Sequence, residues 1–150
     1  MSLKSQVESG IKDAMRAKAV DTLRALRSIK SLILLEETKP GSSSGELSAD
    51  DELKLLTKAA KQRRESADIY RTQGREDLLQ VEEAELAIIE QFLPKQLTEK
   101  EIKTKVQEII DRVGASGPSD MGKVMGVATK ELAGQADGRV VSTLVKSLLA

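Results

Sequence analysis

Two carboxylates, Glu82 and Glu85, are the first candidates for chemistry because they fall on the apolar face of an amphipathic segment. The rest of that face consists of large apolar residues: Leu78, Val81, Ile88, Ile89 and Phe92. Facing helices can hold metal ions with such carboxylates, but di-iron bundles add histidine, and this chain has none. Buried carboxylates are normally paired with cations. We therefore predict a structural ion-pair network of Arg63, Arg64, Glu82 and Glu85, with no metal and no cofactor.

Four cations near the C-terminus form a second candidate site. Lys123 and Lys130 are seven residues apart and lie opposite the apolar stripe of their segment, and Arg139 and Lys146 repeat that spacing. Seven residues are close to two helical turns, so each pair shares one helix face. The spacing alone favours an ordinary solvated surface. If the four cations are a site, phosphates are the ligands that they would bind.

Two glycines, Gly122 and Gly126, follow Pro118 and lie on the flank of the same apolar stripe. Glycines at the start of a helix can bring backbone amides to a phosphate. The segment matches neither a phosphate-binding Walker loop nor a dinucleotide-binding motif. We therefore expect the pair to let another helix approach closely, with phosphate contact as the lesser alternative.

Apolar residues recur at three- and four-residue spacing almost throughout, which predicts an all-α protein. Asp21, Ser48, Thr98 with Glu101, and Asp137 have the types and positions of helix caps. Pro40–Gly45 is expected to be a flexible loop. The predicted helices cover about residues 3–15, 21–33, 48–72, 76–92, 98–113, 118–132 and 137–148.

A domain boundary is expected at Pro94, because proline cannot continue a helix and moves the preceding residue out of the helical region. The sequence predicts an N-terminal four-helix region over residues 1–94 and a small three-helix bundle over residues 95–150. The second part is near the lower size limit for an independent hydrophobic core.

The composition excludes several classes of function. Without Cys or His, the chain has no disulfide, no Cys/His zinc site and no histidine for acid–base catalysis. Lys plus Arg equals Asp plus Glu at 24 each, so any nucleic-acid surface must be local. No apolar run approaches the roughly 18 residues of a membrane helix. We expect a soluble, cytoplasmic protein that does not contact membranes and is not catalytic alone.

Four segments resemble the GatB/YqeY family over nearly the whole chain: Lys61–Ser66, Phe92–Leu97, Asp120–Gly126 and Gly134–Val141. The first two resemble the free-standing branch. The last two are shared with the C-terminal tail of the GatB subunit of the tRNA-dependent amidotransferases. The resemblance implies that residues 95–150 form a bundle of the ubiquitin-associated type.

In those amidotransferases, which are glutamine-dependent carbon–nitrogen ligases acting on Glu-tRNA or Asp-tRNA, the matching tail contacts tRNA. The catalytic chemistry lies in parts that this chain lacks. The resemblance thus implies a non-catalytic accessory protein that binds tRNA or a tRNA-containing complex through Lys123, Lys130, Arg139 and Lys146. Gln135 stands where many relatives have a basic residue, which removes one candidate contact. The alternative is a protein–protein adaptor that uses apolar surface around Met121 and Met125.

Overall fold

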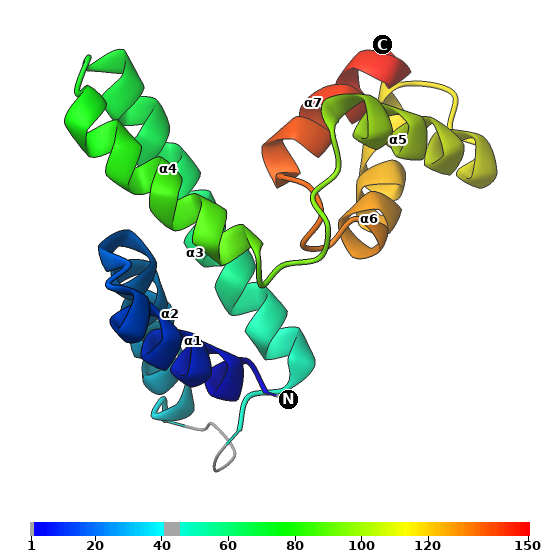
Figure 1. Ribbon diagram of the computed structural model, residues 1–150. Helices are drawn as coiled ribbons and strands as arrows, with labels where there is room; N and C mark the ends of the chain where they lie inside the picture. Colours follow the sequence, from blue (N-terminus) through cyan, green and yellow to red (C-terminus); the bar gives the residue numbers. More distant parts are fainter. Residues whose placement is uncertain (1, 41–45) are drawn as a thin grey trace. The chain divides into compact units, whose positions relative to one another are not determined.

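The computed structural model describes residues 2–40 and 46–150, and these residues form α-helices, one short 3-10 helix and no strand (Figure 1). The all-α prediction is confirmed. Except for Pro40, the predicted loop Pro40–Gly45 lies outside the described residues. The elements are α1 (Leu3–Ala17), α2 (Val20–Glu37), α3 (Ala49–Thr72), α4 (Glu76–Glu90), α5 (Glu99–Val113), η1 (Pro118–Asp120), α6 (Met121–Glu131) and α7 (Gly138–Leu149).

The chain divides into two compact units, Met1–Leu93 and Pro94–Ala150. We refer to them as unit 1 and unit 2. The division falls one residue before the boundary predicted from Pro94. That each unit folds alone stays a prediction.

In unit 1, α1 packs on α2, and α3 packs on α4 as a long helical hairpin that also contacts α2. The core between them is aliphatic, with Val7, Ile29 and Ala60 fully buried. Ala67 and Leu79 are buried outside that core. Figure 1 shows that the end of the hairpin where α3 passes into α4 extends past α1 and α2. The far half of the hairpin is therefore held mainly by α3–α4 contacts.

The helix starts differ from the predictions at two places. α2 begins at Val20, not after an Asp21 cap, because Lys18 takes a left-handed conformation and Ala19 bonds back to Ala14. Asp21 instead lies in the first turn of α2, where its charge favours the helix N-terminus. Pro118 starts the 3-10 helix η1, and α6 begins only at Met121.

α4 ends at Glu90, two residues before the predicted end. The amides of Gln91, Phe92 and Leu93 donate to the carbonyls three residues earlier, at 3.2, 3.0 and 3.2 Å. This tighter 3-10 pattern is common at helix ends. It follows from Pro94, which disfavours the α conformation at Leu93.

Unit 2 is built from α5, α6 and α7, each of which packs on the other two, with η1 against α6 and α7. Its core is separate from that of unit 1 and centres on the fully buried Val106, Ile109, Val124, Ala128 and Val145. The segment before α5 belongs to this unit. The Gln96 side chain donates to Gly134 O at 2.6 Å, and Leu97 N donates to Gln135 O at 2.9 Å.

Candidate functional sites

The first candidate site is an ion-pair cluster centred on one arginine of α3. Arg63 Nη1 lies 3.2 Å from Glu82 Oε2 and 3.1 Å from Glu85 Oε2, both on α4. Arg63 Nη2 donates to Ser28 Oγ of α2 at 3.3 Å. One guanidinium thus joins three helices, which is a structural role because it supplies the counter-charge that buried carboxylates require.

Arg64, the other predicted member, does not contact Glu82 or Glu85. It donates to Glu90 Oε1 at 3.3 Å, one turn further along α4. Among the described residues, no group of three or more acidic side chains is arranged to hold a metal ion. Ser28 was missed by the sequence analysis, since a serine on a largely apolar helix gives no signal of its partner.

The four predicted phosphate-binding cations are all exposed. Lys123 and Lys130 lie on α6, and Arg139 and Lys146 lie on α7, which packs against α6. In the part of the chain that the structure describes, Lys123, Lys130 and Lys146 form no ion pair. Their charges are therefore not neutralised by the protein.

Three acidic residues lie close to these cations in the sequence, and each accepts hydrogen bonds. Both oxygens of Glu131 accept from Arg112 of α5, and this hydrogen bonding lowers the pKa of the Glu131 carboxyl. Asp120 accepts from Ser116 N at 2.9 Å, and Asp137 caps α7 by accepting from Arg139 N at 3.0 Å. Arg112 compensates the charge of Glu131, whereas Asp120 and Asp137 keep theirs, so the four cations of α6 and α7 still outnumber the uncompensated carboxylates next to them in the sequence.

Gly122 and Gly126 contradict the expectation of close helix packing. Both are exposed, and a Cβ built on either would meet no described atom within 4 Å. α6 turns Val124 and Ala128 to the core, so the glycines lie on its open side. The result is an uncovered stretch of helix backbone adjacent in sequence to Lys123.

The described residues of unit 2 expose no large hydrophobic side chain. Met121 and Met125, on which the adaptor alternative depended, are half-buried and pack against the unit 2 core. The exposed large hydrophobics are all in unit 1: Met15, Val20, Leu34, Leu35 and Ile69.

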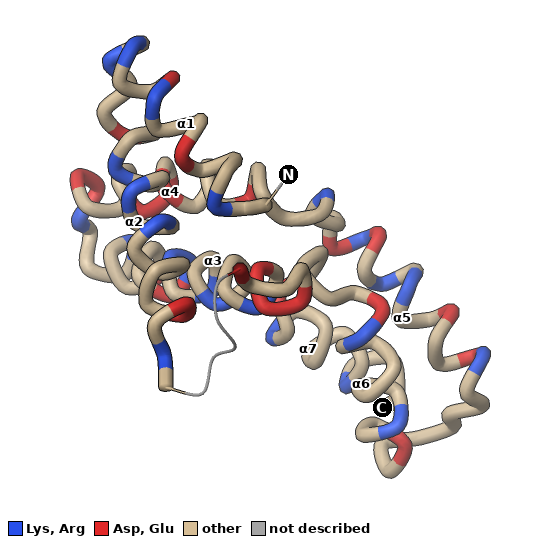
Figure 2. The backbone as a smooth tube through the Cα atoms, turned by 90° about the horizontal axis from the view of Figure 1, so that it is seen from below, with Lys and Arg blue, Asp and Glu red and all other residues tan. Residues whose placement is uncertain are grey.

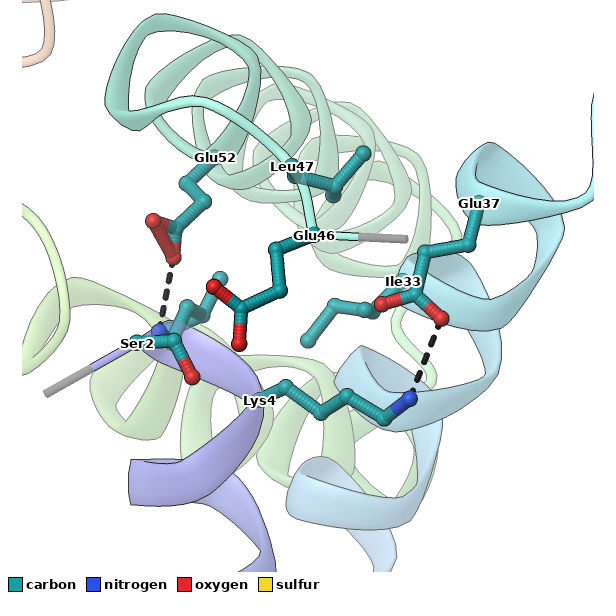
Figure 3. A pocket seen from close by; sticks show the side chains of 8 residues that line it. Ser2, Lys4, Ile33, Glu37, Glu46, Leu47 and Glu52 are labelled. Carbon is teal, nitrogen blue, oxygen red and sulfur yellow. Dashed lines mark hydrogen bonds and ion pairs between the residues drawn. The ribbon is translucent and has the colours of Figure 1, made fainter. Parts of the chain in front are cut away.

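A small hollow near the start of α1 is lined by three carboxylates, Glu37, Glu46 and Glu52 (Figure 3). Glu52 of α3 accepts from Leu3 N at 2.7 Å, and Glu37 of α2 pairs with Lys4 at 3.1 Å. The hollow has a volume of about 10 Å³, which is room for one water molecule. Its contacts tie the starts of α1 and α3 to the end of α2, so we assign it a structural role. Sequence reasoning missed it because Glu52 and Leu3 are 49 residues apart.

The fold and these clusters define a small all-α protein, with an ion-pair cluster inside one unit and exposed cations on two neighbouring helices of the other. The sequence model of the family described as Yqey-like protein matches residues 4–149. The chain therefore belongs to the YqeY-like family, as its motifs predicted.

Two curated relatives share one name, altered inheritance of mitochondria protein 41, mitochondrial. The Clavispora lusitaniae protein is 30% identical over 153 residues, covering 98% of this chain and 87% of the relative. The Meyerozyma guilliermondii protein is 32% identical over 120 residues, covering 78% of this chain. The chain spans only 61% of the length of that second relative.

The mitochondrial names of both relatives contradict the predicted cytoplasmic localisation, which was wrong. That prediction rested on composition and on the lack of a long apolar run. Neither property distinguishes one compartment from another. No helix within the described ranges is long and apolar enough to cross a membrane.

Proposed function

We propose that unit 2 binds tRNA, or a complex containing tRNA, through the phosphate backbone, and that the protein acts as a non-catalytic accessory factor. The observation that carries the proposal is the charge of the α6–α7 surface. Three of its four cations have no acidic partner among the described residues, while Glu131, the acidic residue of α6, is paired with Arg112 of α5. Phosphate oxygens are the natural counter-charge for such Lys and Arg side chains.

The open backbone at Gly122 and Gly126 adds a second, steric argument. A helix that lacks side chains on one face lets a bulky polyanion approach closely, which lets neighbouring lysines reach its phosphates. Isolated glycines inside a helix cost about 1 kcal/mol each relative to alanine, and no packing contact offsets this cost in α6.

The choice of tRNA as the ligand rests on resemblance. Asp120–Gly126 and Gly134–Val141 resemble the tRNA-contacting tail of the amidotransferase GatB subunit, a resemblance that implies a bundle of the ubiquitin-associated type. The names of the curated relatives describe an effect on mitochondria and specify no ligand. A protein–protein adaptor is less favoured, because unit 2 exposes no large apolar side chain in its described residues.

The test is equilibrium binding of fluorescently labelled tRNA at several salt concentrations. The double variant Lys123→Glu/Lys146→Glu reverses two unpaired, exposed cations and should leave folding intact. We expect a loss of affinity of at least about tenfold and a salt dependence lower by about one unit for each lost phosphate contact. The matched control is Lys100→Glu/Lys103→Glu on α5, which also reverses two exposed lysines of unit 2.

The control variant should lose much less affinity than the α6–α7 variant. Equal losses would show that binding follows net charge only, which contradicts a specific surface. If the parent protein does not bind tRNA at physiological salt, the RNA proposal is wrong, and capture of a protein partner would support the adaptor.

A further inference from the structure

The turn between α1 and α2 contains an unusual residue. Lys18 has φ 55° and ψ 34°, a left-handed conformation that is usually left to glycine at the end of a helix. Its amide bonds to the last turn of α1, and Ala19 N donates to Ala14 O at 2.9 Å. A residue with a side chain is strained in this conformation, so Lys18 lowers the stability of the fold relative to glycine at the same position.

Two large apolar side chains flank this turn. Met15, in the last turn of α1, is 56% exposed, and Val20, the first residue of α2, is 65% exposed. Beside them, Ala14, Ala17 and Ala19 line a cleft of about 330 Å³ that Ile88 and Phe92 close on its other side. Asp13, Thr22 and Gln91 also line this cleft, so Met15 and Val20 stand next in the sequence to a mixed, partly apolar surface.

The same hairpin end is basic. Residues 12–27 contain five Lys or Arg and only two Asp. The two Asp form i,i+3 pairs with Arg16 and Arg24 in which every side chain is well exposed, so these pairs are weak. The other cations, Lys12, Lys18 and Arg27, have no ion pair among the described residues. Figure 2 shows Lys and Arg gathered at the far end of α1 and the start of α2.

We propose that the α1–α2 turn binds the surface of a membrane that contains anionic phospholipids. Met15 and Val20 would lie at the boundary between headgroups and acyl chains, and Lys18 with its neighbouring cations would contact lipid phosphates. RNA phosphates would satisfy the cations but give no favourable place to Met15 and Val20. An anionic lipid surface matches both the charge and the exposed apolar side chains.

Such binding departs from the expectation, drawn from the sequence, that the protein does not contact membranes. That expectation rested on the lack of a membrane-spanning helix, which needs about 20 apolar residues. A surface element needs only a few inserted side chains and electrostatic attraction, which contributes about 1 kcal/mol for each Lys or Arg near the membrane. The inference does not depend on the proposed RNA surface, which lies on unit 2.

The test is co-sedimentation of the full-length protein with vesicles of phosphatidylcholine alone and of phosphatidylcholine with about one third phosphatidylglycerol. We expect at least about tenfold tighter binding to the anionic vesicles, weakened by added salt. Met15→Ser/Val20→Ser should reduce that affinity by about tenfold or more. The matched control, Leu35→Ser/Ile69→Ser, removes two equally exposed apolar side chains elsewhere in unit 1 and should bind like the parent.

Lys18→Gly separates binding from folding. Glycine relieves the left-handed strain, so the variant should be at least as heat-stable as the parent. Its affinity for anionic vesicles should nevertheless fall about fivefold, because one headgroup contact is lost.

Three results would overturn the proposal. The parent could bind neutral and anionic vesicles equally, or the Leu35/Ile69 control could lose as much affinity as the Met15/Val20 variant. In the third, the Met15/Val20 and Lys18 variants would bind vesicles like the parent but lose affinity for tRNA, which would assign the turn to RNA instead.

Discussion

Arg63 and Glu85 lie 3.1 Å apart between α3 and α4, and Glu85 is the one charged residue in the buried class among those described, at 5% exposure. The same Arg63 nitrogen also contacts Glu82, whose side chain is 13% exposed. One guanidinium therefore serves two poorly solvated carboxylates, so its removal matters more than the loss of either carboxylate.

Arg63→Met should destabilise unit 1 by about 3–5 kcal/mol, because it leaves buried negative charge without a partner. Glu85→Gln should cost less, about 1–3 kcal/mol, since Arg63 keeps Glu82. Urea unfolding followed by fluorescence of Tyr70, the single tyrosine, reports on unit 1.

Arg71 supplies the control for this prediction. It also contacts two carboxylates, of Asp68 and Glu83, but all three side chains are more than half exposed. Arg71→Met should cost no more than about 1 kcal/mol. Equal effects of Arg63→Met and Arg71→Met would contradict the structural importance of the buried cluster.

The two units should fold independently, and trypsin should separate them at Lys95. Lys95 is exposed, but Gln96 and Leu97 are bonded to Gly134 and Gln135 of unit 2. Gln96→Ala should therefore speed cleavage after Lys95, because it releases the segment around the scissile bond. Mass spectrometry would identify the fragments, and circular dichroism would show whether each stays helical. Early cuts within α3 or α5, or unfolded fragments, would argue against two independent domains.

Unit 2 should lose stability in acid. The capping-box hydrogen bonds with the Thr98 backbone and side chain lower the pKa of Glu101, and hydrogen bonding to Arg112 lowers that of Glu131. A carboxyl with a lowered folded-state pKa stabilises the fold above its unfolded pKa, about 4.3 for Glu. This stabilisation is lost as pH falls through the folded pKa.

The measurement is the thermal midpoint of the parent and of Glu131→Gln between neutral pH and pH about 3. The variant should melt earlier at neutral pH, and the two midpoints should converge in acid as Glu131 of the parent becomes protonated. A constant difference at every pH would mean that the Arg112–Glu131 contact has no electrostatic role.

Features that depend on neighbours in sequence were predictable. Thr98 and Glu101 form the expected capping box, Ser48 and Asp137 cap their helices, and Gly114 ends α5 with φ 71°. The cap contacts join residues two or three apart, and the end of α5 depends on the φ angle of a single glycine, so residue type and position suffice to predict them. The end of α4 was misplaced by two residues because helix boundaries change gradually through 3-10 bonds.

Features that depend on helix rotation and on distant segments were not predictable. Helical periodicity placed Glu82 and Glu85 on the apolar face but could not tell that Arg63 contacts them while Arg64 contacts Glu90. It gave no sign that Ser28 completes the cluster. The spacing of Gly122 and Gly126 was compatible with packing or with an open face, and only the position of α6 on its neighbours decides between them.

Replacing Gly122 or Gly126 by alanine should stabilise unit 2 and weaken RNA binding at once. Each Cβ enters open space, so the gain in helix propensity, about 0.5–1 kcal/mol per site, has no steric cost in the folded protein. Thermal unfolding followed by circular dichroism would measure the gain. If the bare backbone lets phosphates approach Lys123 and Lys130, the added methyl groups should lower tRNA affinity even though the fold is firmer.

Gly138→Ala is a control for this pair of effects, since its Cβ would also enter open space but at the start of α7. It should leave tRNA affinity near the parent value. Higher stability together with lower tRNA affinity would indicate that Gly122 and Gly126 belong to a binding surface. If they were needed only for packing, the substitutions would change stability and affinity in the same direction. Destabilisation by Gly122→Ala would show that a neighbour covers α6 in solution, and unchanged tRNA affinity in a stabilised variant would remove the glycines from the binding surface.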